Sequence, residues 1–367
     1  MKYYIIAGEA SGDLHGSNLI KELLKLDLQA TFRAWGGDLM NKAGAEIIKH
    51  YRDLAFMGFT EVVMNIKTIL KNISFCKQDI LAFKPDVIIL IDYPGFNLRI
   101  AEFAKNNNIK VVYYISPQIW AWKESRITKI KKNVDEMLVI LPFEKDFYAK
   151  HNMNVHFVGH PLIDAIQKFN ENENFKRLNN LNEKPLIALL PGSRKQEIKK
   201  ILPIMLEAVN EFIEYQLVVA AAPSVEIKFY QEIINNRNVT IIQNDTYNIL
   251  KNSSAALVTS GTATLETALF GVPQVVCYKG GAISYWLAKK LIRVKYISLV
   301  NLIMDKTVVK ELIQDDCNPN KISFELHHIL FNKDKILELK TQMLKLKELL
   351  GGSGASAKAA KLIYNKS

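Results

Sequence analysis

The sequence predicts an α/β protein made of two Rossmann-like domains with parallel sheets. Short apolar runs recur along the 367 residues, and each is followed by a polar or glycine-rich turn and then by a helical pattern. Most of these runs are unbroken rather than alternating, which is typical of parallel strands covered on both faces. Hydrophobic residues make up 49% of the chain and charged residues 23%, a balance that excludes a disordered protein.

The predicted strands fall into two groups. In the N-terminal half the apolar runs cover residues 3–7, 87–91, 111–115 and 137–141. In the C-terminal half they cover residues 186–190, 217–221, 239–242, 255–258 and 274–277. Amphipathic helices are expected between them, for example over 16–26 and 201–215. This alternation predicts a parallel sheet in each half, with the active site at the carboxyl ends of the strands.

A polar stretch rich in Asn, Glu and Lys follows Gly159-His160-Pro161-Leu162 and predicts the boundary between the two halves. We therefore expect a first domain over 1–165 and a second over 166–345. His160, in a Gly-His-Pro turn, suits a structural or hinge residue. The remaining segment, 346–367, contains the glycines of GGSG and one further helix over 355–364.

The charge balance favours anionic partners. The 48 Lys and Arg residues exceed the 37 Asp and Glu residues by 11, which suits phosphorylated substrates, nucleic acid or an anionic membrane surface without choosing among them. The three cysteines lie far apart and the seven histidines show no metal-binding spacing, so neither a disulfide scaffold nor a metal site is expected. No apolar run approaches the roughly 18 residues of a membrane span, so we expect a cytoplasmic protein, soluble or bound to a membrane surface.

The first motif is GEASGDLHG, residues 8–16, directly after the first strand. Its glycines allow tight turning, and a helix N-terminus follows, where amide groups favour anions. Glu9 and Asp13 would repel a phosphate, so recognition of hydroxyl groups suits them better. The alternative is an ordinary strand-to-helix turn with capping acids. His15 lies within the same motif.

The second motif is IDYPGFN, residues 91–97, at the end of the strand predicted over 87–91. An aspartate at the carboxyl end of a strand is well placed to act as a general base on a substrate hydroxyl. Asp92 is that residue. The alternative is that Asp92 caps a helix starting near Asn97.

Two motifs of the C-terminal half suit a nucleotide diphosphate. In LLPGSRKQEI a strand is followed by Gly192, Ser193 and Arg194, so that free amides, a hydroxyl and a guanidinium matched to phosphate oxygens come together. In TSGTATLE, hydroxyls and glycine precede a helix, and a glutamate one turn later can accept hydrogen bonds from a ribose; the residues are Ser260, Gly261, Thr262 and Glu266. The alternative for the second is a helix cap with a capping-box glutamate.

Two further patterns have several interpretations. An apolar stripe at helical spacing is either core or a membrane-facing surface; it comprises Phe56, Met57, Phe59, Val62, Val63, Ile66, Ile69, Leu70 and Ile73. Trp120 and Trp122 precede Arg126 and several lysines, a pattern that suits nucleic-acid stacking, a lipid-facing surface or plain core packing.

Taken together, these residues resemble lipid-A-disaccharide synthase, a family of GT-B glycosyltransferases with two Rossmann-like domains facing a central cleft. The resemblance rests on segments in order over nearly the whole chain: GEASGDLHG, FMGFTEVV, KPDVIILIDYPGFN, YYISPQIWAW, LPFEKDFY, VGHPL, LLPGSRKQEI, TSGTATLETALFGVP, SLVNLI and ELIQDDC. The specific segments are GEASGD, SPQIWAW and the tail from ISLVNLI to ELIQDDC, whereas PGSR and SGTATLE occur broadly in GT-B enzymes. Residues 169–184 match no motif of the family.

The resemblance implies transfer of 2,3-diacylglucosamine from UDP-2,3-diacylglucosamine to the 6-hydroxyl of 2,3-diacylglucosamine 1-phosphate (lipid X), with inversion and release of UDP. Asp92 matches the catalytic base and Glu9 a second acid of the acceptor pocket. Further acceptor-side residues would be Ser11, Asp13, His15, Asn97 and Gln118. The UDP site would comprise Gly192, Ser193, Arg194, Ser260, Gly261, Thr262, Glu266, Asn301 and Gln314. No cofactor or metal is implied, because amides and an arginine can stabilise the leaving diphosphate.

The family also implies a place on the cytoplasmic face of the inner membrane, where the apolar stripe and the surface around Trp120, Trp122 and Arg126 would meet acyl chains. The helix over 355–364 would return to the first domain, and a homo-oligomer is left open. Two alternatives remain. One is a GT-B relative acting on unacylated UDP-N-acetylglucosamine, such as a 2-epimerase or a peptidoglycan-type transferase. The other is a nucleic-acid-binding protein, for which no recognition motif is present.

Overall fold

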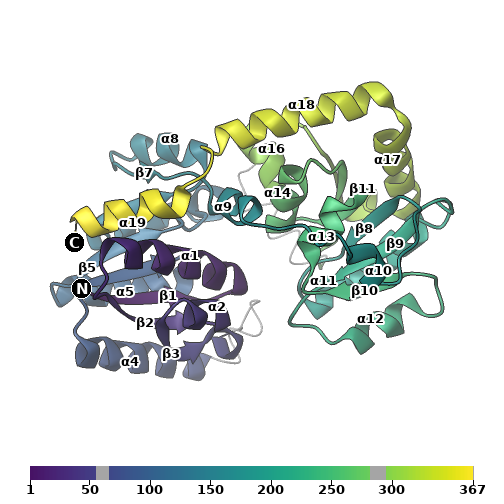
Figure 1. The fold of residues 1–367 in the computed structure, drawn as a ribbon. Helices are drawn as coiled ribbons and strands as arrows, with labels where there is room; N and C mark the ends of the chain where they lie inside the picture. Colours follow the sequence, from purple (N-terminus) through teal and green to yellow (C-terminus); the bar gives the residue numbers. More distant parts are fainter. Residues whose placement is uncertain (55–65, 282–294, 367) are drawn as a thin grey trace. The chain divides into compact units, whose positions relative to one another are not determined.

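The computed structural model describes residues 1–54, 66–281 and 295–366. The chain forms two compact units (Figure 1): unit 1 comprises Met1–Asp164 and Leu350–Ser367, and unit 2 comprises Ala165–Leu349. Each unit is built around one parallel sheet with helices on its faces, which confirms the predicted fold class.

The sheet of unit 1 has seven strands in the order β3-β2-β1-β4-β5-β6-β7. The strands are β1 (Lys2–Ala7), β2 (Thr31–Gly36), β3 (Ala45–His50), β4 (Val87–Ile91), β5 (Lys110–Tyr114), β6 (Glu136–Val139) and β7 (His156–Phe157). The helices are α1 (Ala10–Leu26), α2 (Asp38–Lys42), η1 (Tyr51–Leu54), α4 (Ile66–Phe83), α5 (Pro94–Asn106), α6 (Ile119–Trp122), η2 (Glu124–Arg126), α7 (Ile127–Asn133), α8 (Pro142–Lys150), α9 (Pro161–Gln167), which runs into unit 2, and α19 (Ala355–Lys366).

Both faces of this sheet are covered, which is why its central strands β1, β4 and β5 are apolar except for the lysines that begin β1 and β5. On one face α1 and α19 pack together (Figure 1). On the other face α4, α5 and α7 contribute to a core that includes Tyr4, Ile80, Ile88 and Tyr113. The C-terminal helix thus folds onto the first helix of the chain.

The sheet of unit 2 has six strands in the order β10-β9-β8-β11-β12-β13. The strands are β8 (Leu186–Leu190), β9 (Gln216–Ala221), β10 (Thr240–Gln243), β11 (Ser253–Thr259), β12 (Gln274–Tyr278) and β13 (Lys310–Ile313). The helices are α10 (Phe175–Leu178), α11 (Lys195–Ala208), α12 (Ile227–Ile234), α13 (Thr246–Lys251), α14 (Thr262–Leu269), α16 (Leu299–Met304), η3 (Gln314–Asp316), α17 (Pro319–Phe331) and α18 (Lys333–Leu349).

Several predicted boundaries were wrong. The helix expected over 201–215 runs instead from Lys195 to Ala208, and α1 begins at Ala10 rather than at residue 16. Four strands, β2, β3, β7 and β13, were not predicted, because their segments contain no unbroken apolar run. In β2, Arg33 interrupts the run because its guanidinium reaches Asp79 on α4 at 3.0 Å, and β3, β7 and β13 are edge strands that expose polar side chains.

Candidate active site

The four predicted turns follow the central strands of the two sheets. In unit 1, GEASGDLHG follows β1 and the Asp92 turn follows β4, which are neighbours in the sheet. In unit 2, PGSR follows β8 and the SGT turn follows β11, which are also neighbours. In both sheets the strand order reverses at this pair, and such a switch point is where ligands bind in open α/β sheets. Each unit therefore places two of the predicted turns at its switch point.

Asp92 lies at the end of β4 on an unusual backbone. Its φ is 42° and that of Tyr93 is 48°, both in the left-handed region. The N-cap of α5 is Tyr93, and no side chain caps that helix, so the capping alternative for Asp92 was wrong. Burial, together with the charge of Glu9, raises the pKa of Asp92 to about 7. A carboxyl group with this pKa can accept a proton near neutral pH.

The main chain of Asp92 is held by two buried side chains. The amide nitrogen of Asn97 donates to the Asp92 carbonyl at 2.7 Å and to the Ile91 carbonyl at 3.2 Å. The hydroxyl of Tyr113, on the neighbouring strand β5, donates to the same Asp92 carbonyl at 2.5 Å. Asn97 is fully buried, so its amide acts on this backbone. Tyr113 was not predicted from the sequence.

The start of α1 lies beside this turn. Glu9 and Ser11 are exposed there, and Glu9 is close enough to raise the pKa of both Asp92 and Tyr93. A Cβ atom on Gly8 would come within 2.4 Å of the Tyr93 ring. A glycine is therefore required at residue 8 so that Tyr93 can lie against the end of β1.

Asp13 performs a different task from the one expected. Its buried carboxylate accepts backbone N–H groups from Gly37 at 2.8 Å, Leu39 at 3.0 Å and Met40 at 3.0 Å. It therefore caps the start of α2 from a distance, and its hydrogen-bonding capacity is largely used within the fold.

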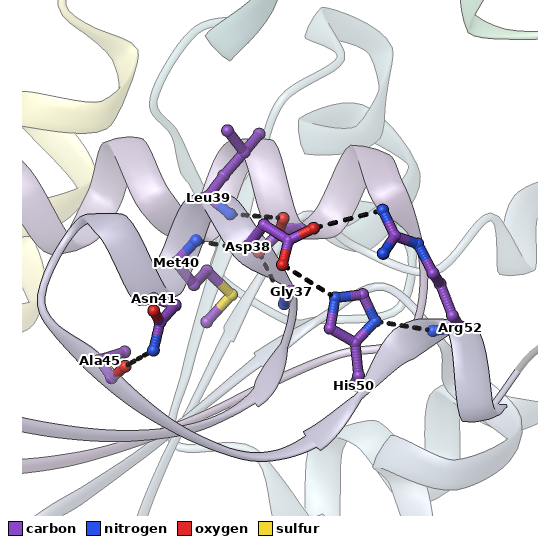
Figure 2. A network of polar contacts seen from close by, with 9 residues as sticks. Gly37, Asp38, Leu39, Met40, Asn41, Ala45, His50 and Arg52 are labelled. Atoms are coloured by element: carbon purple, nitrogen blue, oxygen red, sulfur yellow. Dashed lines mark hydrogen bonds and ion pairs between the residues drawn. The ribbon is translucent and has the colours of Figure 1, made fainter. Parts of the chain in front are cut away.

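The first residue of α2, Asp38, is exposed, and its carboxylate faces the side chains of Arg52 and His50 (Figure 2). The Arg52 guanidinium lies 3.2 Å and the His50 imidazole 3.6 Å from its carboxylate. These contacts connect the start of α2 to the end of β3. They are surface contacts and stabilise the loop only weakly.

His15 and His160 are both buried in unit 1. Burial lowers the pKa of His15 to about 4, and burial with His15 nearby lowers the pKa of His160 to about 3. Both are therefore neutral at physiological pH. The His160 backbone N–H donates to the Leu350 carbonyl at 3.0 Å, and the Asp164 carboxylate accepts from Gly354 at 2.6 Å and Ser356 at 3.0 Å. These bonds connect the end of the first segment of unit 1, residues 160–164, with the start of its second segment, residues 350–356. This agrees with a structural role for His160.

The tryptophan segment is anchored by a residue that the sequence did not single out. The Trp120 indole donates to Glu144 on α8 at 3.2 Å and meets Phe143 edge-on. Glu144 is buried, which raises its pKa to about 7. Gln118 is exposed at the start of α6 and Arg126 is half-buried. The Trp122 side chain lies outside what the structure describes.

In unit 2 the PGSR turn presents a cation. Gly192 has φ of 108°, and a Cβ atom there would come within 2.8 Å of the Glu197 carboxylate. Arg194 is the N-cap residue of α11; its guanidinium lies 3.3 Å from Glu197, and its side chain is 57% exposed. Ser193 is exposed beside it. The turn thus offers a guanidinium and a helix N-terminus to an anion.

The SGT turn lies at the end of the neighbouring strand. Gly261 and Thr262 are exposed, and the Ser260 hydroxyl donates to the Ile297 carbonyl at 2.8 Å. Glu266 lies too far into α14, whose N-cap is Gly261, to form a capping box, so that alternative was wrong. Burial raises its pKa.

Tyr247, which the sequence did not single out, orients Glu266. Its hydroxyl donates to the Glu266 carboxylate at 3.2 Å. Its ring packs against Phe270 and against Phe169, with centroids 5.1 and 5.6 Å away. Phe169 belongs to the stretch of unit 2 without a family motif, and its link to Glu266 runs through Tyr247.

Asn301 and Gln314 act on the backbone. Asn301 is fully buried; its amide oxygen accepts from Val308 and Val309, and its nitrogen donates to Glu311 at 2.9 Å. Glu311 also accepts from the backbone of Ile297 and Ser298. The Gln314 side chain accepts the Gly280 N–H at 2.9 Å. Asn301 thus positions the loop that Ser260 contacts, through Glu311.

Most of the apolar stripe lies outside the described residues, namely Phe56, Met57, Phe59, Val62 and Val63, as does the side chain of Ile66. Of the rest, Ile73 is core, Ile69 packs against that core, and Leu70 is 53% exposed. The described parts of the chain contain no helix long and apolar enough to cross a membrane, and no cluster of three side chains suited to a metal ion.

Comparisons with known proteins agree over the whole length. Residues 3–364 match the model of the lipid-A-disaccharide synthetase family. The lipid-A-disaccharide synthase of Syntrophus aciditrophicus is 41% identical over 97% of this chain and 95% of its own, and that of Coxiella burnetii (strain CbuG_Q212) is 39% identical over 98% and 97%. Among solved structures, the UDP-GlcNAc 2-epimerase of Neisseria meningitidis bound to UDP-GlcNAc shares the fold, with a TM-score of 0.67 at 14% identity over 100% of this chain and 99% of its own. The calicheamicin glycosyltransferase CalG4 does so with a TM-score of 0.62 at 14% identity over 99% and 97%.

Proposed function

The chain belongs to the lipid-A-disaccharide synthase family, and from that membership we propose how its residues carry out the reaction. The family performs a glycosyl transfer in lipid A biosynthesis. The diacylated glucosamine of UDP-2,3-diacylglucosamine passes to the 6-hydroxyl of lipid X, which gives the disaccharide 1-phosphate and UDP.

Asp92 is the general base in this proposal. The acceptor oxygen attacks the anomeric carbon from the face opposite the diphosphate, the bond from that carbon to the UDP oxygen breaks, and the hydroxyl proton passes to the Asp92 carboxylate. The observation that carries the proposal is the position of Asp92 at the switch point of unit 1, with a pKa raised to about 7. Glu9 and Ser11, exposed beside it, would contact the acceptor.

Unit 2 binds the UDP donor in this proposal. Arg194 and the amides of the PGSR and SGT turns would hold the diphosphate, whose negative charge grows as the glycosidic bond breaks. Glu266 would accept hydrogen bonds from the ribose. Asn301 and Gln314 would act indirectly, because their side chains bind the backbone of neighbouring loops.

The test is release of UDP from the diacylated donor, measured with and without lipid X. We expect acceptor-dependent release by the wild type, a kcat about 10²- to 10⁴-fold lower in Asp92→Ala, and donor binding about 10- to 100-fold weaker in Arg194→Ala because a charge-assisted bond contributes about 1.5–3 kcal/mol. Turnover of UDP-N-acetylglucosamine without an acceptor would instead favour the 2-epimerase alternative.

We also propose that the protein associates with the cytoplasmic face of the inner membrane. Both substrates carry acyl chains, the net charge is +11, and exposed Leu70 lies between the exposed Lys67 and Lys71 on α4. Each lysine would contribute about 1 kcal/mol near anionic lipid. Flotation with phosphatidylglycerol vesicles should fall when Lys67 and Lys71 are changed to Glu; unaltered flotation would contradict this surface.

A further inference from the structure

The carboxylate of Asp92 is carried by a backbone that L-residues rarely adopt. Asp92 and Tyr93 both have positive φ, 42° and 48°, and two such residues in succession cost free energy because the Cβ atom approaches the carbonyl oxygen. A turn of this kind persists only where its surroundings hold it in place. The contacts that hold it are therefore part of the machinery that presents the base.

Three bonds hold this turn. The Tyr113 hydroxyl donates to the Asp92 carbonyl at 2.5 Å, and Asn97 donates to the same oxygen at 2.7 Å. The Asp92 N–H donates to the Ile115 carbonyl at 3.2 Å. Tyr113 lies in β5 and Ile115 directly follows that strand, so the neighbouring segment of the chain fixes both backbone polar groups of Asp92.

We propose that Tyr113 is a positioning residue of the transfer reaction: its hydroxyl holds the Asp92 carbonyl and so keeps the left-handed turn that presents the carboxylate to the acceptor hydroxyl. This rests on the proposed function, in which Asp92 is the base. Tyr113 itself touches no substrate, because its side chain is fully buried. Burial also raises its pKa well above the usual value, so the phenol remains neutral and keeps its proton on the Asp92 carbonyl.

Removing the hydroxyl should let the turn relax. The Asp92 carbonyl would keep only the Asn97 bond, and the backbone could move toward the right-handed region that L-residues favour. The carboxylate would then shift, and a displacement of about 1 Å at a reacting group can lower the rate by about 10²-fold. Donor binding should be unaffected, because the proposed UDP site lies in unit 2.

Tyr113→Phe tests this with the ring kept in place. We expect kcat to fall about 10- to 100-fold while KM for the UDP donor stays within about twofold. The acidic limb of the kcat profile should move to lower pH, because a carboxyl that turns toward water regains its ordinary pKa near 3.9. The matched control is Tyr114→Phe: this residue is the next one along β5 and points to the opposite face, and its hydroxyl makes no hydrogen bond to Asp92. Tyr114→Phe should leave both kcat and the acidic limb of the kcat profile unchanged.

The Asp92→Asn background separates the outcomes. If Tyr113 acts through Asp92, Tyr113→Phe lowers kcat in the wild type but not in Asp92→Asn. An equal loss in both backgrounds, an unchanged kcat or an unmoved limb would overturn the inference while leaving the base in place. Full activity of Asp92→Asn itself would overturn the base and the inference together. Should Tyr113→Phe not fold, Asn97→Ala removes the other donor and is expected to give the same fall in kcat and the same shift of the limb.

Discussion

The charge of Asp92 should destabilise unit 1 at neutral pH, and Asp92→Asn should relieve this. Burial and Glu9 raise the pKa of this carboxyl from 3.8 to about 7 in the folded protein. Between those two pH values the folded protein retains a proton that the unfolded chain has released. The free energy of unfolding therefore falls as pH rises through this window, and the full loss is present above pH 7.

The size of the effect follows from the shift. Going from 3.8 to about 7 is a rise of roughly three pKa units, and at about 1.4 kcal/mol per unit the loss reaches at most about 4 kcal/mol. Asn has the same shape and no charge. The gain in stability of Asp92→Asn over the wild type should therefore be near its minimum at about pH 4 and rise toward about 4 kcal/mol at about pH 8. The same variant should lose most of its transfer activity.

Native-state hydrogen exchange of the amides in β4 and β5 measures this, after correction for the intrinsic pH dependence of exchange. These amides report the opening of unit 1 separately from that of unit 2. The matched control is Asp146→Asn, which removes an exposed carboxylate on α8. If Asp92→Asn and Asp146→Asn show the same protection relative to wild type at every pH, the buried charge of Asp92 is not a cost to the fold and the reasoning fails.

Three other substitutions give separate predictions. Glu9→Gln should move the acidic limb of the kcat profile to lower pH, because the Glu9 charge raises the pKa of Asp92; a limb at the wild-type pH would contradict this. Asp13→Ala leaves three backbone N–H groups without their acceptor, so amide exchange over residues 37–40 should accelerate at least 100-fold, corresponding to about 3 kcal/mol, whereas a smaller change would mean that water replaces the carboxylate. The hydrogen bond from Tyr247 lowers the pKa of Glu266, so Tyr247→Phe should raise that pKa and leave more Glu266 protonated at acidic pH. UDP binding measured by calorimetry should therefore weaken most at acidic pH; equal weakening at all pH values would speak against an ionised Glu266 at the ribose.

The fold was predictable wherever strands are covered on both faces. The runs over 87–91 and 186–190 match β4 and β8 residue for residue, because a central parallel strand must be apolar at every position. The edge strand β3 is only partly buried, and β7 has only two residues, so neither contains an apolar run. Their pairing is decided by tertiary contacts that a local pattern does not record.

The site was predictable at the strand ends but not at the residues behind them. Asp92 and Arg194 follow apolar strands directly, so their sequence neighbours mark them. Tyr113, Glu144 and Tyr247 act on residues that lie between 19 and 24 positions away in the chain, and nothing in their own segments shows which backbone or carboxylate they contact. Such partners are found only when the sheet order is known.

The buried acids show why a raised pKa does not by itself identify the base. Burial raises the pKa of both Asp92 and Glu144 to about 7. Glu144, however, is only 1% exposed and accepts bonds from Trp120 and from the backbone of its own helix start, so no substrate hydroxyl can reach it. Asp92 is partly exposed. The side-chain donors Asn97 and Tyr113 bind its carbonyl, and the backbone N–H of Tyr93 is the donor to its carboxylate. Where the side-chain donors bind the main chain of an acid, the side chain is left to do chemistry; where they bind the carboxylate, the acid holds the fold together.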